Sequence, residues 1–508
     1  MAPRAADRAD DTAFTPSRDR FEQVCAFLTD REAASLTHSE LERRLTVELR
    51  ELVRLLFQDH LDLRAVREQR RDDVVDAEGN RRGSVETGHV RPLHTVFGTV
   101  EVTRLAYRRR GDRNLCPADQ TLNLPRELHS HGLRELSAIE SARGSFTEAS
   151  QAIGRSTGVR LGKRQIEQLA ARAAIDFDAF YAQPARQQAT VTDGDLLVLS
   201  ADGKGIVMRP DALRPGTAKA AAQATGKLQT RLSKGEKRHR KRIAEVGAVY
   251  DLTPQARTPT DIIGRGDVAD NHTIRPVAPT ASNKWLTASV IDTAATVIGS
   301  IFDEAQRRDP THQRTWIVLV DGANHQIDCI HAEAENRGVQ VQIVCDFIHV
   351  LEYLWSAAWS FFTEADPAAE NWVSAKALAV LNGHACTVAA AIRRKATTRG
   401  LEPSARRNAD RCASYLLAKR DYLDYPKALA AGWPIATGII EGACRHLVKD
   451  RLDLTGARWG LDGAETILKL RALRANGDFE QYWTFHLNQE QHRVHQARYA
   501  HPTLPTAA

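Results

Sequence analysis

The stretch Trp316-Ile317-Val318-Leu319-Val320-Asp321-Gly322 decides the fold class of this chain. Its five apolar residues form a short continuous run, as expected for a strand buried inside a sheet. A second stretch of the same design, Leu196–Ala201, is likewise followed by an Asp-Gly pair. We therefore predict an α/β fold from about residue 190 onward, with further strands at Ile243–Leu252, Trp285–Ile291 and Val339–Cys345.

Helical patterns flank this α/β region on both sides. Residues 365–432 contain few β-branched runs and many Ala, Leu and Arg residues, which indicates a helical insertion after the last strand. Thr37 and Glu40 form a capping box before a long helical pattern, and Gly98 separates two short strand patterns. The expected segments are a frayed N-terminus (1–35), a helix and β-hairpin region (36–130), a helix-turn-helix-like segment (131–185), the first part of the core (190–350), the helical insertion (351–435), the last part of the core (436–490) and a polar tail (491–508).

Two short helical patterns near residue 160 are typical of a helix-turn-helix. Gly158 separates them, and the second pattern begins with Lys163, Arg164 and Gln165. Side chains of these types suit phosphates and base edges. Ordinary helical packing explains the same pattern equally well, so both interpretations stay open.

The composition is that of a globular protein with several modules. The chain has 508 residues, of which 42% are hydrophobic and 26% charged, and its formal net charge of +6 is compatible with nucleic acid without identifying a partner. No apolar run is long enough to span a bilayer and the polar start lacks the apolar core of a signal peptide, so we expect a cytoplasmic protein with no membrane partner. The seven scattered cysteines, with no C-x-x-C pair, predict buried thiols and neither disulfides nor a zinc cluster.

The two Asp-Gly pairs carry the first chemical signal. Asp202 and Asp321 each follow an apolar strand pattern, which predicts that their carboxylates lie at the rim of the sheet, where α/β proteins hold ligands and metals. Two such aspartates on neighbouring strands can share an Mg²⁺ ion, because this ion prefers carboxylate oxygens and leaves positions open for phosphate. A single Asp-Gly pair is more often a helix cap or a turn, but the matched pair favours a functional site.

Glu441 is the candidate for a third carboxylate. Phosphodiester chemistry with two metal ions needs another ligand, and Glu441 lies in a helical pattern over Gly438–Arg451. Arg445 and Lys449 follow Glu441 by four and eight residues, hence on roughly the same helix face, where cations suit a DNA backbone. The alternative is an exposed Glu–Arg pair on a solvated helix, and spacing alone favours that alternative.

A basic run between the first two core strands is another candidate for DNA contact. It covers Lys227–Arg242. Charge runs of this kind are more often solvated loops, but in a DNA enzyme such a run would bind phosphates and steepen the salt dependence of binding. The residues proposed for DNA contact are Lys237, Arg238, Arg240, Lys241 and Arg242.

The order of these motifs resembles that of the DDE transposases, and the local sequences are similar to bacterial insertion-sequence transposases of the ISKra type. The resemblance extends from about residue 40 to about residue 485. The strings that carry it are Ser200-Ala201-Asp202-Gly203-Lys204, Val320-Asp321-Gly322-Ala323, Cys345–Trp355, Ile440-Glu441-Gly442-Ala443-Cys444-Arg445-His446 and Gly456-Ala457-Arg458-Trp459.

The resemblance implies a ribonuclease-H-like catalytic core with an all-helical insertion, preceded by an α+β N-terminal DNA-binding region. It implies that the catalytic triad holds Mg²⁺, with Mn²⁺ as a substitute, and that a C/D-x-x-H signature braces the active site. Related chains often carry a cysteine-rich zinc knuckle after the hairpin, but here only Cys116 remains. We therefore expect no zinc, and the arginines before Cys116 either contact DNA or form a solvated loop. The implied triad is Asp202, Asp321 and Glu441, and the signature residues are Asp346 and His349.

The implied reaction is metal-dependent cleavage of phosphodiesters at transposon ends, followed by attack of the freed 3′-hydroxyl on target DNA. The implied partners are double-stranded DNA, from the transposon ends and from the target, and further copies of this chain, because both ends must be held together in a dimer or larger assembly. The expected location is the bacterial cytoplasm, on the nucleoid when DNA is bound. Two alternatives stay open: a nuclease with the same core that cuts without joining, and a non-catalytic DNA-binding protein derived from a transposase.

Overall fold

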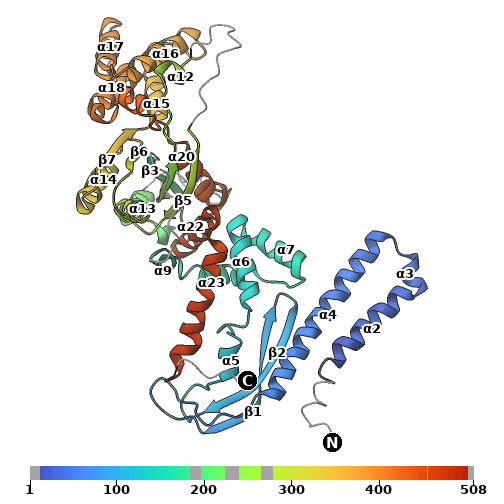
Figure 1. Ribbon diagram of the computed structural model, residues 1–508. Coiled ribbons are helices and arrows are strands. Elements are labelled where there is room, and N and C mark those ends of the chain that lie inside the picture. The colour runs from blue at the N-terminus through green and yellow to red at the C-terminus, as the bar shows by residue number, and fades with distance from the viewer. Residues whose placement is uncertain (1–11, 184–195, 224–239, 265–278, 455, 502–508) are drawn as a thin grey trace, which may run out of the picture. The chain divides into compact units, whose positions relative to one another are not determined.

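The protein divides into two compact units along an unusual boundary (Figure 1). The computed structural model describes residues 12–183, 196–223, 240–264, 279–454 and 456–501. The first unit combines residues up to Gln183 with residues from Gly477 onward, and the second unit is formed by the residues between them. Among the described residues, no helix is both long enough and apolar enough to cross a membrane.

The second unit is built around a mixed five-stranded sheet with the strand order β5-β4-β3-β6-β7. β3, β4 and β5 pair antiparallel, whereas β3, β6 and β7 pair parallel. All five strands lie where the apolar runs predicted them, so the prediction of an α/β fold is confirmed. The strands are β3 (Leu196–Val207), β4 (Lys241–Leu252), β5 (Ala281–Ser289), β6 (Thr315–Val320) and β7 (Val341–Cys345).

β3 is longer than the sequence predicted, and this changes the place of Asp202. The apolar run ends at Ala201, but pairing with β4 continues to Val207, which lies opposite Lys241. Asp202 therefore lies inside β3, opposite Val246, and the expectation that it follows the strand is wrong. The strand continues because the antiparallel ladder with β4 still satisfies its backbone groups after pairing with β6 has stopped.

Helices cover this sheet closely, which explains why its strands are continuous apolar runs. Every residue of β6 after Thr315 is buried, and because successive side chains point to opposite faces, both faces of β6 are covered. α13 (Ala294–Arg308) packs on β4. A Cβ atom on Gly247 would lie 2.5 Å from Cγ2 of Ile301, so this close approach requires glycine. Outside the segment between β7 and α20, the other elements of this unit are η1 (Pro210–Ala212), α10 (Pro215–Gln223), α12 (Pro259–Ile262), α14 (Asn324–Arg337), α20 (Gly438–Ala443), the π-helix η3 (Cys444–Lys449), α21 (Asp450–Leu452) and α22 (Leu461–Asn476).

The segment between β7 and α20 is helical and forms a bundle (Figure 1). α15 packs against α16 and α18, and α17 packs against α18. Nζ of Lys395 lies among three aromatic rings, at 5.1 Å from the ring centre of Phe361, 4.4 Å from that of Phe362 and 5.4 Å from that of Trp372. Cation–π contacts therefore hold its ammonium group in place. The helices are α15 (Phe347–Ala358), α16 (Pro367–Leu381), α17 (Ala385–Thr398), α18 (Pro403–Ala418), η2 (Arg420–Tyr422) and α19 (Tyr425–Ala430).

The first unit begins with helices where a frayed terminus was expected. α2 packs against α4, and the backbone N–H of Ser17 donates to the buried carboxylate of Asp59, at 3.1 Å. The expectation for residues 1–35 is therefore wrong for residues 15–35, because burial against α4 orders a polar segment whose own pattern is weak. The elements of this unit are α2 (Thr15–Thr29), α3 (Arg31–Ser35), α4 (His38–Arg67), β1 (Ser84–Thr95), β2 (Gly98–Arg108), α5 (Pro117–Thr121), α6 (His131–Arg143), α7 (Phe146–Thr157), α8 (Lys163–Ala173), α9 (Phe177–Tyr181), α23 (Phe479–Glu490), the π-helix η4 (Gln491–His495) and η5 (Gln496–Arg498).

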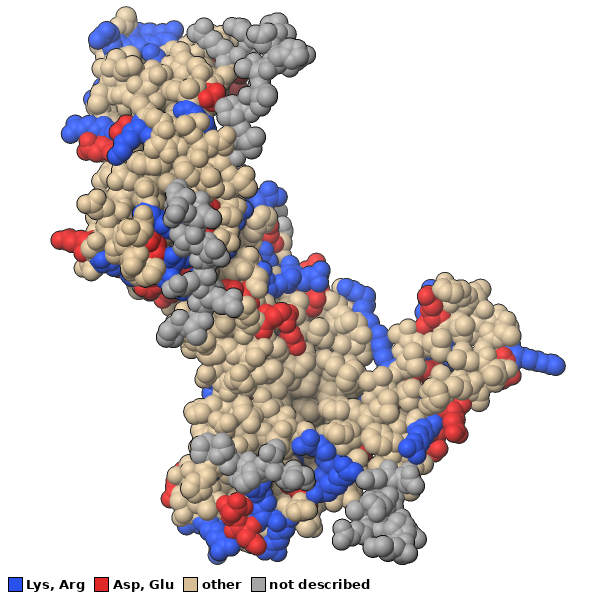
Figure 2. Space-filling model, in the orientation of Figure 1, with Lys and Arg blue, Asp and Glu red and all other residues tan. Residues whose placement is uncertain are grey.

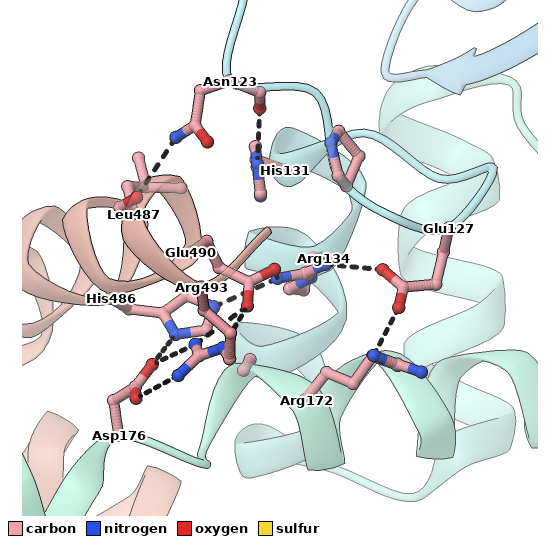
Figure 3. A network of polar contacts seen from close by, with 12 residues as sticks. Asn123, Glu127, His131, Arg134, Arg172, Asp176, His486, Leu487, Glu490 and Arg493 are labelled. Atoms are coloured by element: carbon pink, nitrogen blue, oxygen red, sulfur yellow. Dashed lines mark hydrogen bonds and ion pairs between the residues drawn. The ribbon is translucent and has the colours of Figure 1, made fainter. Parts of the chain in front are cut away.

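The last helix of the chain returns to the first unit and is fixed there by a buried polar network (Figure 3). Arg134 on α6 is fully buried and bonds to Glu490 on α23, at 2.6 Å, and to Glu127, at 2.8 Å. Asp176 accepts from the ring of His486, at 2.7 Å, and from Arg493. Burial alone would raise the pKa of Asp176, but these two partners hold it at about 2.

Two expected boundaries are consequently wrong. The core was expected to extend to residue 490, but it ends at Asn476, because α23 packs in the first unit. Residues 491–508 were expected to form a polar tail, yet His495 and Tyr499 are buried in the first unit. His495 bonds to the carbonyl oxygen of Leu124, at 2.8 Å. Composition suggested a tail because this segment is rich in polar residues. Their buried polar groups find hydrogen-bond partners in residues that are far away in the sequence.

We predict that Glu490→Gln destabilises the first unit by about 3 kcal/mol, because the buried guanidinium of Arg134 loses a charged partner. Hydrogen–deuterium exchange of the full-length protein, read on peptides from α6 and α23, measures this loss. The matched control is Glu480→Gln, which changes an exposed glutamate on the same helix. Equal exchange in the two variants would contradict the structural role given to Glu490.

Candidate active site

The register of the parallel strand pair β3–β6 brings the two predicted aspartates together. Leu196 pairs with Thr315 and Ser200 pairs with Leu319. Continuing this register by two residues puts Asp202 beside Asp321, on neighbouring strands that lie about 4.8 Å apart in such sheets. Both aspartates are partly exposed, whereas the residues just before them are buried. The prediction that they meet at one rim of the sheet agrees with this geometry.

Short hydrogen bonds hold both carboxylates in place. Oδ1 of Asp321 accepts from the backbone N–H of Ala323, at 2.8 Å, and Oδ1 of Asp202 accepts from that of Gly203, at 2.6 Å. Gly322 has a φ of +96°, and a Cβ atom there would lie 3.1 Å from the hydroxyl of Tyr415. The Asp-Gly pair after β6 is therefore needed both for backbone conformation and for space.

Glu441 lies near this rim without joining the two aspartates. It is exposed in α20, which packs on β3 and β4. Cys444 follows it by three residues, and its thiol donates to Oδ2 of Asp202, at 3.2 Å. Burial, followed by the negative charge of Asp202, raises the pKa of the Cys444 thiol, so the thiol stays protonated as a donor. In the described ranges, no group of three or more His, Cys, Asp or Glu side chains is placed to hold a metal ion.

The helix after Glu441 differs from the expected geometry. Residues Cys444–Lys449 form a π-helix, so the argument that Arg445 and Lys449 share a face with Glu441 at α-helical spacing is wrong. Both cations are nevertheless exposed, and Nε of Arg445 lies 3.7 Å from Oδ1 of Asp450. Widened helical turns of this kind are frequent at functional sites.

Asp346 and His349 form the pair that the sequence indicated. Asp346 is fully buried at the N-terminus of α15, where Oδ1 accepts from the backbone N–H of Ile348, at 2.9 Å, and Oδ2 accepts from the hydroxyl of Thr437. Nδ1 of His349 lies 3.7 Å from Oδ2 of Asp346. The Asp346 carboxylate, assisted by Asp321, raises the pKa of His349 to about 8 although partial burial acts in the opposite direction. The pair links α15 to the segment before α20.

Glu245 is a further carboxylate at this rim, and sequence reasoning missed it. It lies on β4 opposite Gly203, so its side chain is on the other face of the strand pair from that of the neighbouring Asp202. Burial, and then the negative charge of Asp202, raise the pKa of Glu245. Its strand was predicted, but only the antiparallel register shows that Glu245 reaches the rim. The carboxylates here repel one another, and a bound cation would relieve that repulsion.

Residues of the helical segment hold the ends of β6 and β7, and no sequence pattern had indicated them. The hydroxyl of Tyr415 donates to the carbonyl oxygen of Asp321, at 3.0 Å, and that of Tyr425 donates to the carbonyl oxygen of Cys345, at 2.9 Å. The ammonium of Lys419 donates to Asn324 at the start of α14. The side chains on α18 and after it therefore satisfy backbone groups that the sheet leaves open next to the aspartates.

Trp459 supports the far end of β3. Its backbone N–H donates to the carbonyl oxygen of Val207, at 3.2 Å, and its carbonyl oxygen accepts from Arg209, at 2.8 Å. The guanidinium of Arg451 lies 4.8 Å from the ring centre of Trp459. The string Gly456–Trp459 thus extends the sheet beyond Asp202 and contributes no group to the rim itself.

The helix-turn-helix candidate lies in the first unit and has a core of its own. α6, α7 and α8 enclose buried residues that include Leu133, Ile153 and Ile166. Gly158, with a φ of +77°, ends α7 in the left-handed conformation that the predicted turn needs.

The side chains proposed to read DNA lie at the start of α8. Lys163, Arg164 and Gln165 are all exposed. Oε1 of Gln165 accepts from the backbone N–H of Gly162, at 2.9 Å, so part of this side chain caps α8. Lys163 and Arg164 are the exposed cations of this turn.

The basic run before β4 is only partly described. Lys237 and Arg238 lie outside the described residues. Arg242 donates from Nε to the carbonyl oxygen of Val290, at 2.8 Å, and from Nη1 to that of Ala212, at 3.2 Å. Two backbone acceptors therefore engage part of the Arg242 guanidinium without neutralising its charge, and DNA contact by Arg242 stays a prediction. Arg240 and Lys241 stay at least partly exposed.

The chain has weak structural similarity to a known protein and no match in sequence. No protein-family model matches the sequence, and no curated protein matches it. Among solved structures, the chain is similar to one from the Drosophila P element transposase strand transfer complex, with 9% sequence identity over 73% of this chain and 82% of that chain, and a TM-score of 0.23. A likeness at that TM-score does not establish a common fold.

We predict that His349 titrates with a pKa of about 8 and that Asp346→Asn returns this pKa toward the ordinary value of 6.5. The charged pair stabilises the site fully below pH 6.5, and that contribution is lost as the pH rises through 8. NMR of histidine-labelled protein measures the midpoint, with His349→Gln assigning the signal. Asp328→Asn, an exposed change on α14, is the control and should leave the midpoint unchanged. A midpoint at or below 6.5 in the unaltered protein would contradict the prediction.

Proposed function

We propose that the second unit is a ribonuclease-H-like catalytic core and that the protein is a DNA transposase of the DDE type, related to the ISKra-type insertion-sequence enzymes. The observation that carries this proposal is the parallel register of β3 and β6, which ends at Ser200 opposite Leu319, two residues before Asp202 and Asp321 respectively. The mixed five-stranded sheet and the helical segment after β7 support it. The proposed arrangement is a core from residue 190 to 350, interrupted by helices over 351–435 and resumed at 436.

The chemistry of the donor set fits a divalent cation. Asp202 and Asp321 supply carboxylate oxygens, which Mg²⁺ prefers, and burial and then the negative charge of Asp202 raise the pKa of the neighbouring Glu245. We propose that Asp202, Asp321 and Glu441 hold Mg²⁺, or Mn²⁺ in its place. Glu441 is exposed on a helix that already contacts the rim through Cys444, so its side chain is free to turn toward the aspartates. A bound Mg²⁺ would polarise a phosphoryl oxygen and lower the pKa of a bound water.

The residues of the chain have distinct tasks in this proposal. Asp202 and Asp321 are held rigidly by backbone N–H groups, so their free lone pairs face the rim in a fixed geometry. His349 carries a proton on the ring beside Asp346 near neutral pH, and its positive charge is placed to attract a phosphodiester toward Asp321. Tyr415 acts as a positioning residue, since its hydroxyl donates to the backbone of Asp321 and not to the carboxylate.

DNA contact is assigned to both units. In the first unit, Lys163 and Arg164 open α8 as exposed cations, and in the second unit Arg445 and Lys449 lie on the helix that follows Glu441. Figure 2 also shows Lys and Arg side chains over the outer ends of α17 and α18. The reaction needs two transposon ends and target DNA, so we propose that a dimer or larger assembly acts on the bacterial nucleoid.

We predict that Asp202→Asn lowers end cleavage and strand transfer at least about 1,000-fold, because the substitution removes a charged ligand for the ion that activates the phosphodiester. Labelled DNA of the element's own ends, incubated with full-length protein and Mg²⁺ or Mn²⁺, reports both steps. Binding of Mn²⁺ followed by electron paramagnetic resonance gives a readout that is independent of activity. The matched control is Asp421→Asn, whose side chain is 77% exposed.

Each alternative has its own outcome in this assay. Cleavage without any joined product would support a nuclease and overturn the transposase proposal. DNA binding with neither cleavage nor joining would indicate a non-catalytic DNA-binding protein. Full cleavage activity in Asp202→Asn would show that the catalytic site lies elsewhere.

A further inference from the structure

An arginine-lined cavity lies within the first unit, apart from the candidate active site. Its volume is about 500 Å³, within the range of sites that enclose small molecules. The walls come from β1, β2, the loop after β2, the end of α8 and the π-helix η4. The charged residues that line it are Arg91, Arg104, Arg113, Asp119, Arg126, Arg172, Glu490, Arg493 and Arg498.

Positive charge in and behind the cavity wall exceeds negative charge. Seven arginines line the cavity against two carboxylates. Behind the wall, the network of Figure 3 adds Arg134, Glu127 and Asp176, which bond to residues of the lining. Eight guanidinium groups therefore face four carboxylates, which leaves about four positive charges without a carboxylate partner. His495 does not change this balance, because burial lowers its pKa and keeps it neutral.

Several of the arginines are fixed in place, so the cavity is preorganised. Arg104 is 6% exposed and lies 2.5 Å from Asp119 through Nε. Arg91 donates to the carbonyl oxygen of Pro125, at 2.5 Å, and Arg498 to that of Asn114, at 2.8 Å. A carbonyl oxygen satisfies a donor but does not neutralise the charge, so these guanidinium groups still favour an anion.

Other side chains of the lining have charges or hydrogen-bonding atoms available to a ligand. Arg113 and Arg126 are exposed and have no acidic partner among the described residues. Nδ1 of His89 is buried at the wall, without a hydrogen-bond partner in the described part of the chain. None of the described lining residues is Phe, Tyr or Trp, so the cavity offers no aromatic platform for a base. Its chemistry selects for phosphate and not for a nucleobase.

We propose that this cavity binds the phosphate groups of a ligand and encloses no more than about one nucleotide of it. Arginine is the side chain best suited to this task, because its planar fork donates two parallel hydrogen bonds to phosphate oxygens. A cavity of about 500 Å³ encloses such a group but not a double helix. The phosphate comes either from a free polyphosphate or from the phosphorylated end of a DNA strand.

Calorimetric titration of the full-length protein at low ionic strength tests the proposal. The probes are sodium pyrophosphate, a tetranucleotide with a 5′-phosphate and the same tetranucleotide with a 5′-hydroxyl. The double variant Arg113→Gln, Arg126→Gln is expected to bind the phosphate probe about 10-fold more weakly or worse, since it loses charge-assisted hydrogen bonds. Both side chains are exposed, so the fold should be kept, and circular dichroism checks this.

Two controls make the result specific. Arg43→Gln, an exposed change on α4 far from the cavity lining, should bind the probes as the unaltered protein does. Asp421→Asn, an exposed change in the second unit, should also bind normally, and because the titration measures binding alone, a failure of the proposed catalysis leaves this test intact. Binding of pyrophosphate supports a free polyphosphate as the source, and preference for the 5′-phosphate over the 5′-hydroxyl supports a DNA end. Three results would overturn the proposal. The protein could bind neither pyrophosphate nor either oligonucleotide, or it could bind the two oligonucleotides equally without binding pyrophosphate. Arg43→Gln could also weaken binding as much as the double variant does.

Discussion

The parallel pairing of β3 with β6 is the constraint on which the candidate site depends. It fixes Leu196 opposite Thr315 and Ser200 opposite Leu319, and Asp202 and Asp321 each follow two residues further along their chains. A slip of one residue would turn every side chain of β3 to the other face of the sheet and separate the two carboxylates. Burial enforces the register, because Leu197, Val198 and Leu199 are all fully buried and a slip would disrupt the packing on both faces. The packing of buried apolar residues in β3 therefore determines the position of the Asp202 carboxylate, which is not itself part of the core.

Much of the second unit could be predicted from short apolar runs, and the errors have a common physical cause. The run before Asp321 is buried on both faces, so composition alone revealed β6. The run before Asp202 gave the start of β3 but not its end, because the rest of β3 is held by its partner strand and contains polar residues. Glu245 escaped prediction for the same reason, since its position is defined by pairing and not by its own neighbours in the sequence.

Outside the sheet, too, features set by neighbouring residues could be predicted, whereas features set by distant partners could not. The helices near residue 160 were foreseen from Gly158 and from the cations that open α8, which are local signals. Polar partners distant in sequence were not foreseen: Tyr415 bonds to Asp321, and Glu490 bonds to Arg134. The π-helix after Glu441 is a further case, because nothing in its residues distinguishes it from an α-helical turn. Such features follow from tertiary contacts that only the folded chain defines.

The placement of α23 has a consequence for how the protein is made. The chain passes from the first unit into the second and then back again. During synthesis, α6 and Asp176 emerge roughly 300 residues before His486, Glu490 and Arg493. Until those residues leave the ribosome, Arg134 has no partner from α23, and the first unit cannot bury this charge at low cost. The first unit therefore reaches its final structure only after the second unit has been synthesised, so a chain that ends before α23 lacks part of the first unit even when the second unit is complete.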